Sequence, residues 1–501
     1  MIQENIQQVS QEKKVLSEII EYVLDTKNPS LKVYETLNIT YDNKNIIMVL
    51  LERRDLYNIK RLFRISNIIF THQEILKTKD KSGKDVLSYF IEYATYDLID
   101  EFIRMLSEHS SIEEKKSILS SVDNNGKSHL IMMCENKKFE DLEGTFKHFI
   151  DLIASSCGLN FLHDMLTKPD NDGNNILMTA LKSQNEKIAL KILDLISKTI
   201  IDKEDRIKIE QKLLTQVDTK KKNVLILLSD MKADRSLQDE IIKLVKEIPS
   251  NWMCLTQNDL EGHNVIMLAI MNNNQNMIEN TLSILGAMDD DSKKIVLADL
   301  CKKFDCNGDN FVSLCFQISR GDLYITIVKE MEKIIGEQLI VECLSRTFVN
   351  NRDILHHALL GSNMEAILSL IKYLKSINNI SHNDKRYISE LVMRKDNNNY
   401  SLISYAINKS NYQVCEMILQ SAKEFCDPIT IKILINSKDL DGNPPYVAAK
   451  INGDEKLVHL ISEFAKETGN QESIKEQMIE YEKILQLQSS HITPLISQVF
   501  I

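Results

Sequence analysis

The stretch Asp170-Asn171-Asp172-Gly173-Asn174-Asn175-Ile176-Leu177-Met178-Thr179-Ala180 decides the fold of this chain, because the same phrase returns along the sequence. Each copy has an Asp, a Gly three residues later, an apolar pair at six and seven residues, and a small residue at ten. Other copies start at Asp259, Asp305 and Asp439. A fixed phrase that recurs at intervals of about 20 to 50 residues indicates a solenoid of stacked repeats.

Ten units align on the first residue of this phrase, with a mean interval of (439 − 40)/9, or about 44 residues. Asn43, Lys221, Asn351 and Asn399 stand where the other units have Gly. Asn tolerates positive φ better than other non-glycine residues, so most of these replacements keep the turn. The units start at Thr40, Asp80, Asp123, Asp170, Asp218, Asp259, Asp305, Phe348, Asp396 and Asp439.

Each unit contains signals for one turn and for helices after it. Asp followed by Gly makes a tight turn, because Gly is free to adopt φ > 0. The residue five positions after the Asp is often Asn or Ser, whose side chain can cap a short first helix. A second amphipathic helix follows, and most units add a third amphipathic segment. Examples of the third segment are Ile207–Leu214, Ile295–Leu300, Leu339–Leu344 and Tyr387–Val392.

Two stretches carry a resemblance to the ankyrin-repeat family. The segment Asp439 to Ala449 resembles the motif D-x-x-G-x-T-P-L-H-x-A, and Asp353-Ile354-Leu355-His356-His357-Ala358 resembles its T-P-L-H-x-A core. The resemblance implies an all-α solenoid of about ten ankyrin-like repeats, capped at both ends. Ankyrin units have about 33 residues, so the longer period departs from the family by roughly one helix. A period of about 40 to 47 is also typical of HEAT and armadillo repeats, which makes a HEAT-like α-solenoid the second interpretation.

The array predicts three regions. Residues 1–39 form an N-terminal capping helix region, because the first repeat of a solenoid would otherwise present a bare apolar face to water. Residues 40–469 form the repeat array. Residues 470–501 are expected to form a C-terminal capping helix followed by a flexible tail.

Net charge, cysteine spacing and hydrophobic runs limit which classes of partner and which cellular compartment we expect. The net charge is −11 and there is no long basic block, so we expect no nucleic-acid partner. The nine Cys contain no C-x-x-C pair, which favours a reducing, cytoplasmic compartment. No run of 18 apolar residues and no apolar secretory segment occurs, so we expect neither a membrane span nor a secretory signal.

The sequence gives no support for a catalytic, metal or cofactor site. The Asp170 and Asp305 turns resemble the start of a calcium loop, but position twelve is Leu181 or Phe316 rather than a bidentate Glu. The neighbours His356 and His357 point apart on a helix, and no Cys or His pair has zinc spacing. No nucleophile elbow or phosphate loop is present. We therefore expect no enzyme, no metal and no cofactor.

The resemblance implies a non-catalytic, monomeric scaffold that binds protein partners through the varied surface of its repeats. Long ankyrin-like arrays of this composition are similar to effectors of intracellular bacteria such as Legionella, which act on host proteins in the host cytosol after delivery by a specialised secretion system. A HEAT-like adaptor of cellular origin and an enzyme with an unrecognised site are the alternatives. The candidate partner-binding residues are the turn tips Asn171, Asp172, Leu260, Glu261, Asn307, Asn397, Asn398, Leu440 and Asp441.

Overall fold

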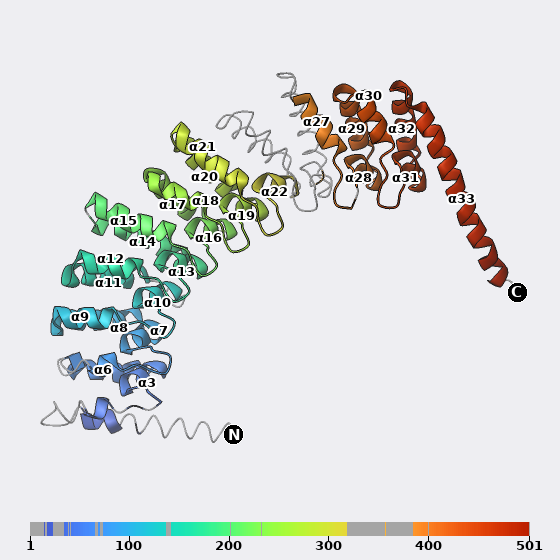
Figure 1. The fold of residues 1–501 in the computed structure, drawn as a ribbon. Helices are drawn as coiled ribbons and strands as arrows, with labels where there is room; N and C mark the ends of the chain where they lie inside the picture. The colour runs from blue at the N-terminus through green and yellow to red at the C-terminus, as the bar shows by residue number, and fades with distance from the viewer. Residues whose placement is uncertain are drawn as a thin grey trace. The chain divides into compact units, whose positions relative to one another are not determined.

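The computed structural model describes residues 15, 18–23, 35–38, 40, 42–65, 69–70, 74–136, 142–200, 202–231, 233–317, 356, 384–398 and 400–499. The chain divides into two compact units, residues 1–260 and 261–501, and each is described by itself. Regular structure in the described residues is helical (Figure 1), apart from two isolated β-bridges, Val122–Ser128 and Lys395–Ser401. The expected all-α solenoid is confirmed.

Each repeat of the first unit contributes a short first helix, a second helix, and a third helix or helical turn. The first helices are α3 (Ile46–Glu52), α7 (Val86–Tyr93), α10 (His129–Glu135), α13 (Ile176–Lys182) and α16 (Val224–Asp230). The second helices are α4 (Leu56–Leu62, continued by η1, Phe63–Ile65), α8 (Tyr96–His109), α11 (Leu142–Cys157), α14 (Glu186–Thr199) and α17 (Arg235–Glu247). The third are α6 (Glu74–Lys77), α9 (Ile112–Leu119), α12 (Leu159–Thr167), α15 (Lys203–Thr215) and η2 with α18 (Pro249–Trp252, Met253–Thr256).

The second unit repeats this order in its described parts. Its first helices are α19 (Val265–Met271), α22 (Phe311–Gln317), α28 (Leu402–Asn408) and α31 (Pro445–Ile451). Its second helices are α20 (Gln275–Ala287), α29 (Tyr412–Phe425) and α32 (Glu455–Glu467), and its third are α21 (Asp290–Lys302), α27 (Asp384–Met393) and α30 (Pro428–Ile435). The last helix is α33 (Gln471–Val499).

The Asp at the start of each turn organises the turn with its own carboxylate. In the Asp218 turn, Oδ1 accepts from the backbone N–H of Lys220 at 2.9 Å and of Lys222 at 2.8 Å. Lys221 takes φ 59° and Asn43 takes φ 62°, the left-handed conformation that Gly adopts in the other turns. The expectation for Asn is therefore confirmed at Asn43, and Lys221 keeps the turn as well, although the expectation rested on Asn. The same Oδ1 bonds occur at Asp80, Asp123, Asp305, Asp396 and Asp439.

The expected helix caps are present, and they also hold the third helix. Asn175 is fully buried; its Oδ1 accepts from the Met178 N–H at 2.9 Å and its Nδ2 donates to the Leu213 carbonyl of α15 at 2.9 Å. One side chain thus satisfies a free N–H at the start of α13 and a free carbonyl at the end of α15. Asn45 makes the same two bonds to Met48 and Ile75, and Asn223 makes them to Ile226 and Cys254.

Successive turns are joined to one another through their backbones. The Asn171 N–H donates to the Asn125 carbonyl at 2.8 Å, and the Thr219 N–H donates to the Asp172 carbonyl at 2.7 Å. In each case the backbone N–H of the residue directly after the Asp is the donor. The acceptor is the backbone carbonyl two positions after the Asp of the previous turn. We call this series the turn ladder. Its other bonds are Asn124 to Ser82 and Leu260 to Lys220 in the first unit, and Cys306 to Glu261 in the second.

The core forms between neighbouring repeats. First helices pack on first helices, as α7 does on α3 and α10, and second helices pack on second helices, as α11 does on α8 and α14. Phe90 of α7 and Phe102 of α8 are buried with ring centroids 4.5 Å apart, and Phe70 lies 5.2 Å from Phe102. Aromatic contacts at this separation add to the free energy gained from area burial.

The third segments at Ile207–Leu214, Ile295–Leu300 and Tyr387–Val392 lie in α15, α21 and α27, so the added helix is confirmed there. The segment Leu339–Leu344 lies outside the described residues, as does the repeat expected at Phe348 except for His356. Most of the expected capping region at 1–39 also lies outside them. At the other end, α33 continues to Val499, through the segment in which the sequence suggested a tail.

The glycines of the turns give a stability prediction. Gly126 has φ 75°, and a Cβ added to it would lie 2.9 Å from the backbone nitrogen of Asn171 in the next turn. Gly126→Ala should therefore cost about 1 to 3 kcal/mol of unfolding free energy. Gly144, in α11, has nothing within 4 Å of an added Cβ. Gly144→Ala should raise stability by about 0.5 to 1 kcal/mol.

Urea unfolding followed by circular dichroism measures both glycine variants. Equal effects of the two substitutions would contradict the close approach of successive turns at Gly126.

Candidate functional site

All nine candidate turn-tip residues lie exposed at the positions directly after the Asp of their turns. Leu260 is 64% exposed and Leu440 is 63% exposed. The backbone of several tips is fixed by the turn ladder, whereas the side chains differ from turn to turn. Their exposure agrees with the sequence prediction, and their binding to a partner stays a prediction.

One tip side chain has a structural role that the sequence reasoning missed. Asn171 Nδ2 donates to the Asn124 carbonyl at 3.0 Å, and Asn124 Nδ2 donates to the Lys81 carbonyl at 2.9 Å. Both amides therefore run alongside the turn ladder and reinforce it. The signal was available in the sequence, because both residues directly follow the Asp of their turn. Asn171 is thus bound within the protein, unlike an apolar tip such as Leu260.

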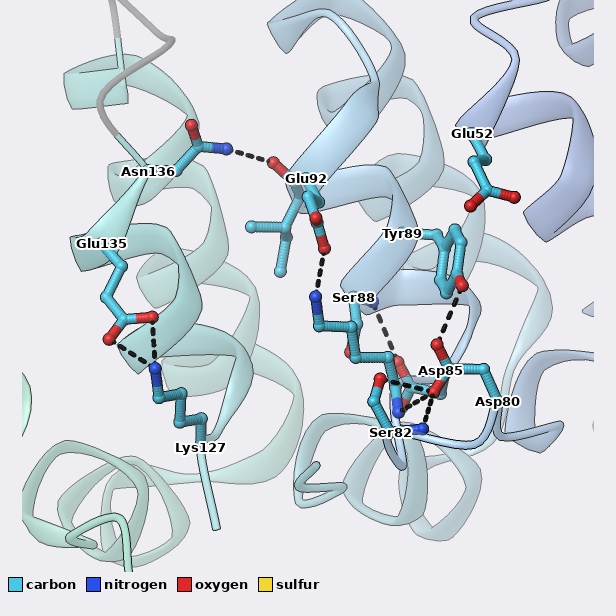
Figure 2. A network of polar contacts seen from close by, with 12 residues as sticks. Glu52, Asp80, Ser82, Asp85, Ser88, Tyr89, Glu92, Lys127, Glu135 and Asn136 are labelled. Atoms are coloured by element: carbon cyan, nitrogen blue, oxygen red, sulfur yellow. Dashed lines mark hydrogen bonds and ion pairs between the residues drawn. The ribbon is translucent and has the colours of Figure 1, made fainter. Parts of the chain in front are cut away.

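A row of ion pairs runs beside the turns and was also missed. Lys84 Nζ lies 2.5 Å from Glu92, and Lys127 Nζ lies 2.7 Å from Glu135 (Figure 2). Each pair links a turn to the last turn of its own first helix, eight residues further on. Half-exposed pairs of this kind contribute about 1 kcal/mol or less each. The other pairs in the row are Lys44–Glu52 and Lys222–Asp230.

A groove lies between the first helices α7 and α10, and we call it the α7–α10 groove. Its floor and walls include Asp123, Ile91 and Met132, and the two ion pairs Lys84–Glu92 and Lys127–Glu135 flank it. At one end the Asn136 amide donates to the Ile91 carbonyl at 2.6 Å (Figure 2). The groove therefore combines an apolar lining with a carboxylate.

A buried pair, His129 and Asp85, joins the same two repeats. His129 Nε2 lies 2.9 Å from Asp85 Oδ1, and both side chains are nearly inaccessible to solvent. Burial by itself raises the pKa of Asp85, but the His129 ring and hydrogen bonds from His129 and the Ser88 amide outweigh it. They hold the pKa of this carboxyl at about 2.

The features considered for catalysis or metal binding have structural roles where they are described. The Asp170 and Asp305 carboxylates accept backbone N–H groups of their own turns. Buried His356 has Nε2 3.3 Å from the Tyr400 carbonyl in the next turn. Among the described residues, no group of three or more His, Cys, Asp or Glu side chains is arranged to hold a metal ion.

The described cysteines are free thiols, and the buried ones behave as small apolar residues. Burial raises the pKa of Cys254 and of Cys315 to about 12, and it raises the pKa of Cys134 further. A thiol with so high a pKa supplies almost no thiolate nucleophile at neutral pH. In the part of the chain that the structure describes, no helix is both long and apolar enough to cross a membrane.

Comparisons with known proteins identify no family for this chain. No protein-family model matches the chain, and no curated protein matches it. Among solved structures, the ankyrin repeat domain of Bcl-3, described as a unique member of the IkappaB protein family, is similar to it at 12% identity and a TM-score of 0.34. That alignment covers 58% of this chain and 99% of the other. So slight a likeness carries no argument about partners.

The Asp85–His129 pair predicts a pH dependence of stability. The pKa of Asp85 in the folded chain lies below its unfolded value of about 3.9, so its charge stabilises the fold above about pH 4. That stabilisation is lost as the pH falls towards 2. Asp85→Asn keeps an acceptor for the Ser88 amide and removes the titration, so its unfolding free energy should fall less steeply than that of the unaltered chain between pH 4 and 2.

Urea unfolding at a series of pH values measures the difference in slope between the two chains. Parallel curves over this range would show that the pair does not hold the pKa of Asp85 low.

Proposed function

We propose that this protein is a non-catalytic scaffold that binds other proteins through the exposed edge formed by its turns and first helices. One observation carries the proposal. The turn ladder fixes the backbone from repeat to repeat, while exposed tip side chains such as Leu260, Glu261, Leu440 and Asp441 differ from turn to turn. A surface built in this way can change its specificity without cost to the core.

We further propose that the chain acts as a monomer, in the cytoplasm, on proteins of a host cell. The motivation is its composition, rich in Ile, Asn and Lys, together with the resemblance to ankyrin-like effectors of intracellular bacteria. A HEAT-like adaptor of cellular origin would use the same surface. An enzyme with an unrecognised site on the solenoid is the other alternative.

Affinity capture from eukaryotic cytosol, read by mass spectrometry, tests the scaffold. The double variant Leu440→Ala with Asp441→Ala removes two exposed tip side chains of the second unit. Its matched control is Ile429→Ala with Ile433→Ala on the third helix α30, where the two side chains are 74% and 53% exposed. We expect the unaltered chain and the α30 control to retain the same partners. The tip variant should lose these partners or bind them at least about tenfold more weakly.

Titration calorimetry with each purified partner measures this loss. Partners that bind the tip variant with unchanged affinity but lose affinity for the Ile429 and Ile433 variant would place the binding surface on α30. That result would overturn the proposal.

A further inference from the structure

In the first unit, the second oxygen of the turn aspartate normally receives a hydrogen bond from within the protein. Asp80 Oδ2 accepts from the Tyr89 hydroxyl at 2.9 Å, as Figure 2 shows, and Asp170 Oδ2 accepts from Asn174 Nδ2 at 3.1 Å. Asp218 Oδ2 accepts from Lys182 Nζ at 2.6 Å. This second oxygen is therefore a position at which the fold places a donor.

Asp123 is the exception among these four turns. Its Oδ1 accepts the backbone N–H groups of Asn125 and Lys127, each at 2.9 Å, but no described residue donates to its Oδ2. The residue is only 7% exposed, and it lines the α7–α10 groove. The residue as a whole is more than nine-tenths buried, but its Oδ2 atom is open to solvent in the groove, so a ligand donor at this oxygen would replace water.

Three substitutions within the repeat pattern leave this oxygen open. Nine residues after the Asp, the Asp80 repeat has Tyr89, whereas the Asp123 repeat has Met132, which has no hydroxyl to donate. The donor to Asp218 comes from the preceding repeat, where Lys182 stands twelve residues after Asp170. In the repeat that precedes Asp123, the residue twelve positions after Asp80 is Glu92. Glu92 is paired with Lys84 and cannot donate. The third donor, Asn174, stands four residues after its Asp, where the Asp123 repeat has Lys127, whose Nζ donates to Glu135 instead.

The surroundings favour a positive group at this position. The charged side chains of the groove are Lys84, Glu92, Asp123, Lys127 and Glu135, which sum to −1. Both lysines are neutralised by their own glutamates, 2.5 Å and 2.7 Å away. Asp123 makes no direct ion pair with a described residue, and Lys127, whose charge also acts on Asp123, is held by Glu135. Ile91 and Met132 supply an apolar wall beside it, suited to the methylene stem of a long side chain.

We propose that the α7–α10 groove binds a lysine side chain of a partner protein, whose ammonium group donates to Asp123 Oδ2. Lys182 makes the same bond to Asp218 within this chain, which shows that the geometry accepts an ammonium group. We commit to lysine rather than arginine because the example of this bond within the chain, Lys182 on Asp218 Oδ2, is made by an ammonium group. The inference rests on the proposed function, since it names the chemistry of the partner.

Methyl NMR of the full chain with ¹³C-labelled methionine tests the site, because Met132 lies in the groove. The Met132 signal is assigned from its absence in Met132→Leu. The probe is Nα-acetyl-lysine N-methylamide. The norleucine analogue, which keeps most of the stem and lacks the ammonium, is the control ligand. We expect a saturable shift of Met132 with a Kd on the order of 10 mM for the lysine probe, and binding at least about tenfold weaker for the norleucine analogue.

Two variants make the test specific. Asp123→Asn keeps Oδ1 for the two backbone bonds and replaces Oδ2 by a donor, so it should weaken lysine binding at least about tenfold. Glu92→Lys supplies an internal ammonium group in the register of Lys182 and should also prevent probe binding. The matched control is Asp218→Asn, whose oxygen is already filled by Lys182. It should leave the lysine affinity unchanged.

An equal response to the norleucine analogue, or an unchanged lysine affinity in Asp123→Asn, would overturn the inference. If the lysine probe fails while captured partners still require Leu440 and Asp441, the scaffold stands and this inference falls. If the probe binds but no partner depends on those tips, lysine binding by the groove is supported and the proposed partner-binding surface at the tips is contradicted.

Discussion

The structure depends on one carboxylate in each repeat, that of the Asp which begins the turn. In the turns where these bonds are described, Oδ1 accepts the backbone N–H groups of the residues two and four positions after the Asp. At Asp170 the described bond is the one from the residue four positions later. Hydrogen bonds to a charged acceptor contribute about 1.5 to 3 kcal/mol each, and these bonds all lie within one turn, so each turn is held by its own Asp. The closed turn then presents one N–H and one carbonyl to its neighbours, and the turn ladder follows. A local interaction thereby sets the long-range order of each unit.

A second buried side chain holds the third helix of the repeat in place. The Asn five residues after the Asp caps the first helix and holds the end of the third helix, as Asn175 does between α13 and α15. The added helix is thus fixed by a hydrogen bond as well as by apolar packing. It ends three or four residues before the Asp of the next turn in the first unit, for instance at Thr167 before Asp170. The repeat closes on itself through two polar side chains, and apolar contacts join it to the next repeat.

Much of this organisation could be predicted from the sequence, because turns, caps and helical periods are local properties. The Asp, the Gly and its replacements Asn43 and Lys221, and the capping Asn were all identified from spacing alone. The features that were not predicted depend on contacts between residues distant along the chain, or on hydrogen-bond donors that one repeat lacks. The Asn171 bond to the Asn124 carbonyl joins positions 47 apart, and the His129–Asp85 pair joins positions 44 apart. The open oxygen of Asp123 follows from donors that its neighbours lack, which no single repeat reveals.

Native-state hydrogen exchange of the turn amides tests the central claim most directly. The N–H groups of Asn124, Asn171 and Thr219 belong to exposed residues at the surface, yet the turn ladder bonds all three. If the ladder holds successive repeats together, these amides should exchange at least about a hundredfold more slowly than in an unfolded chain. Exchange at the unfolded rate, while the amides inside α13 stay protected, would show that the repeats stack through their helices alone and would contradict the account.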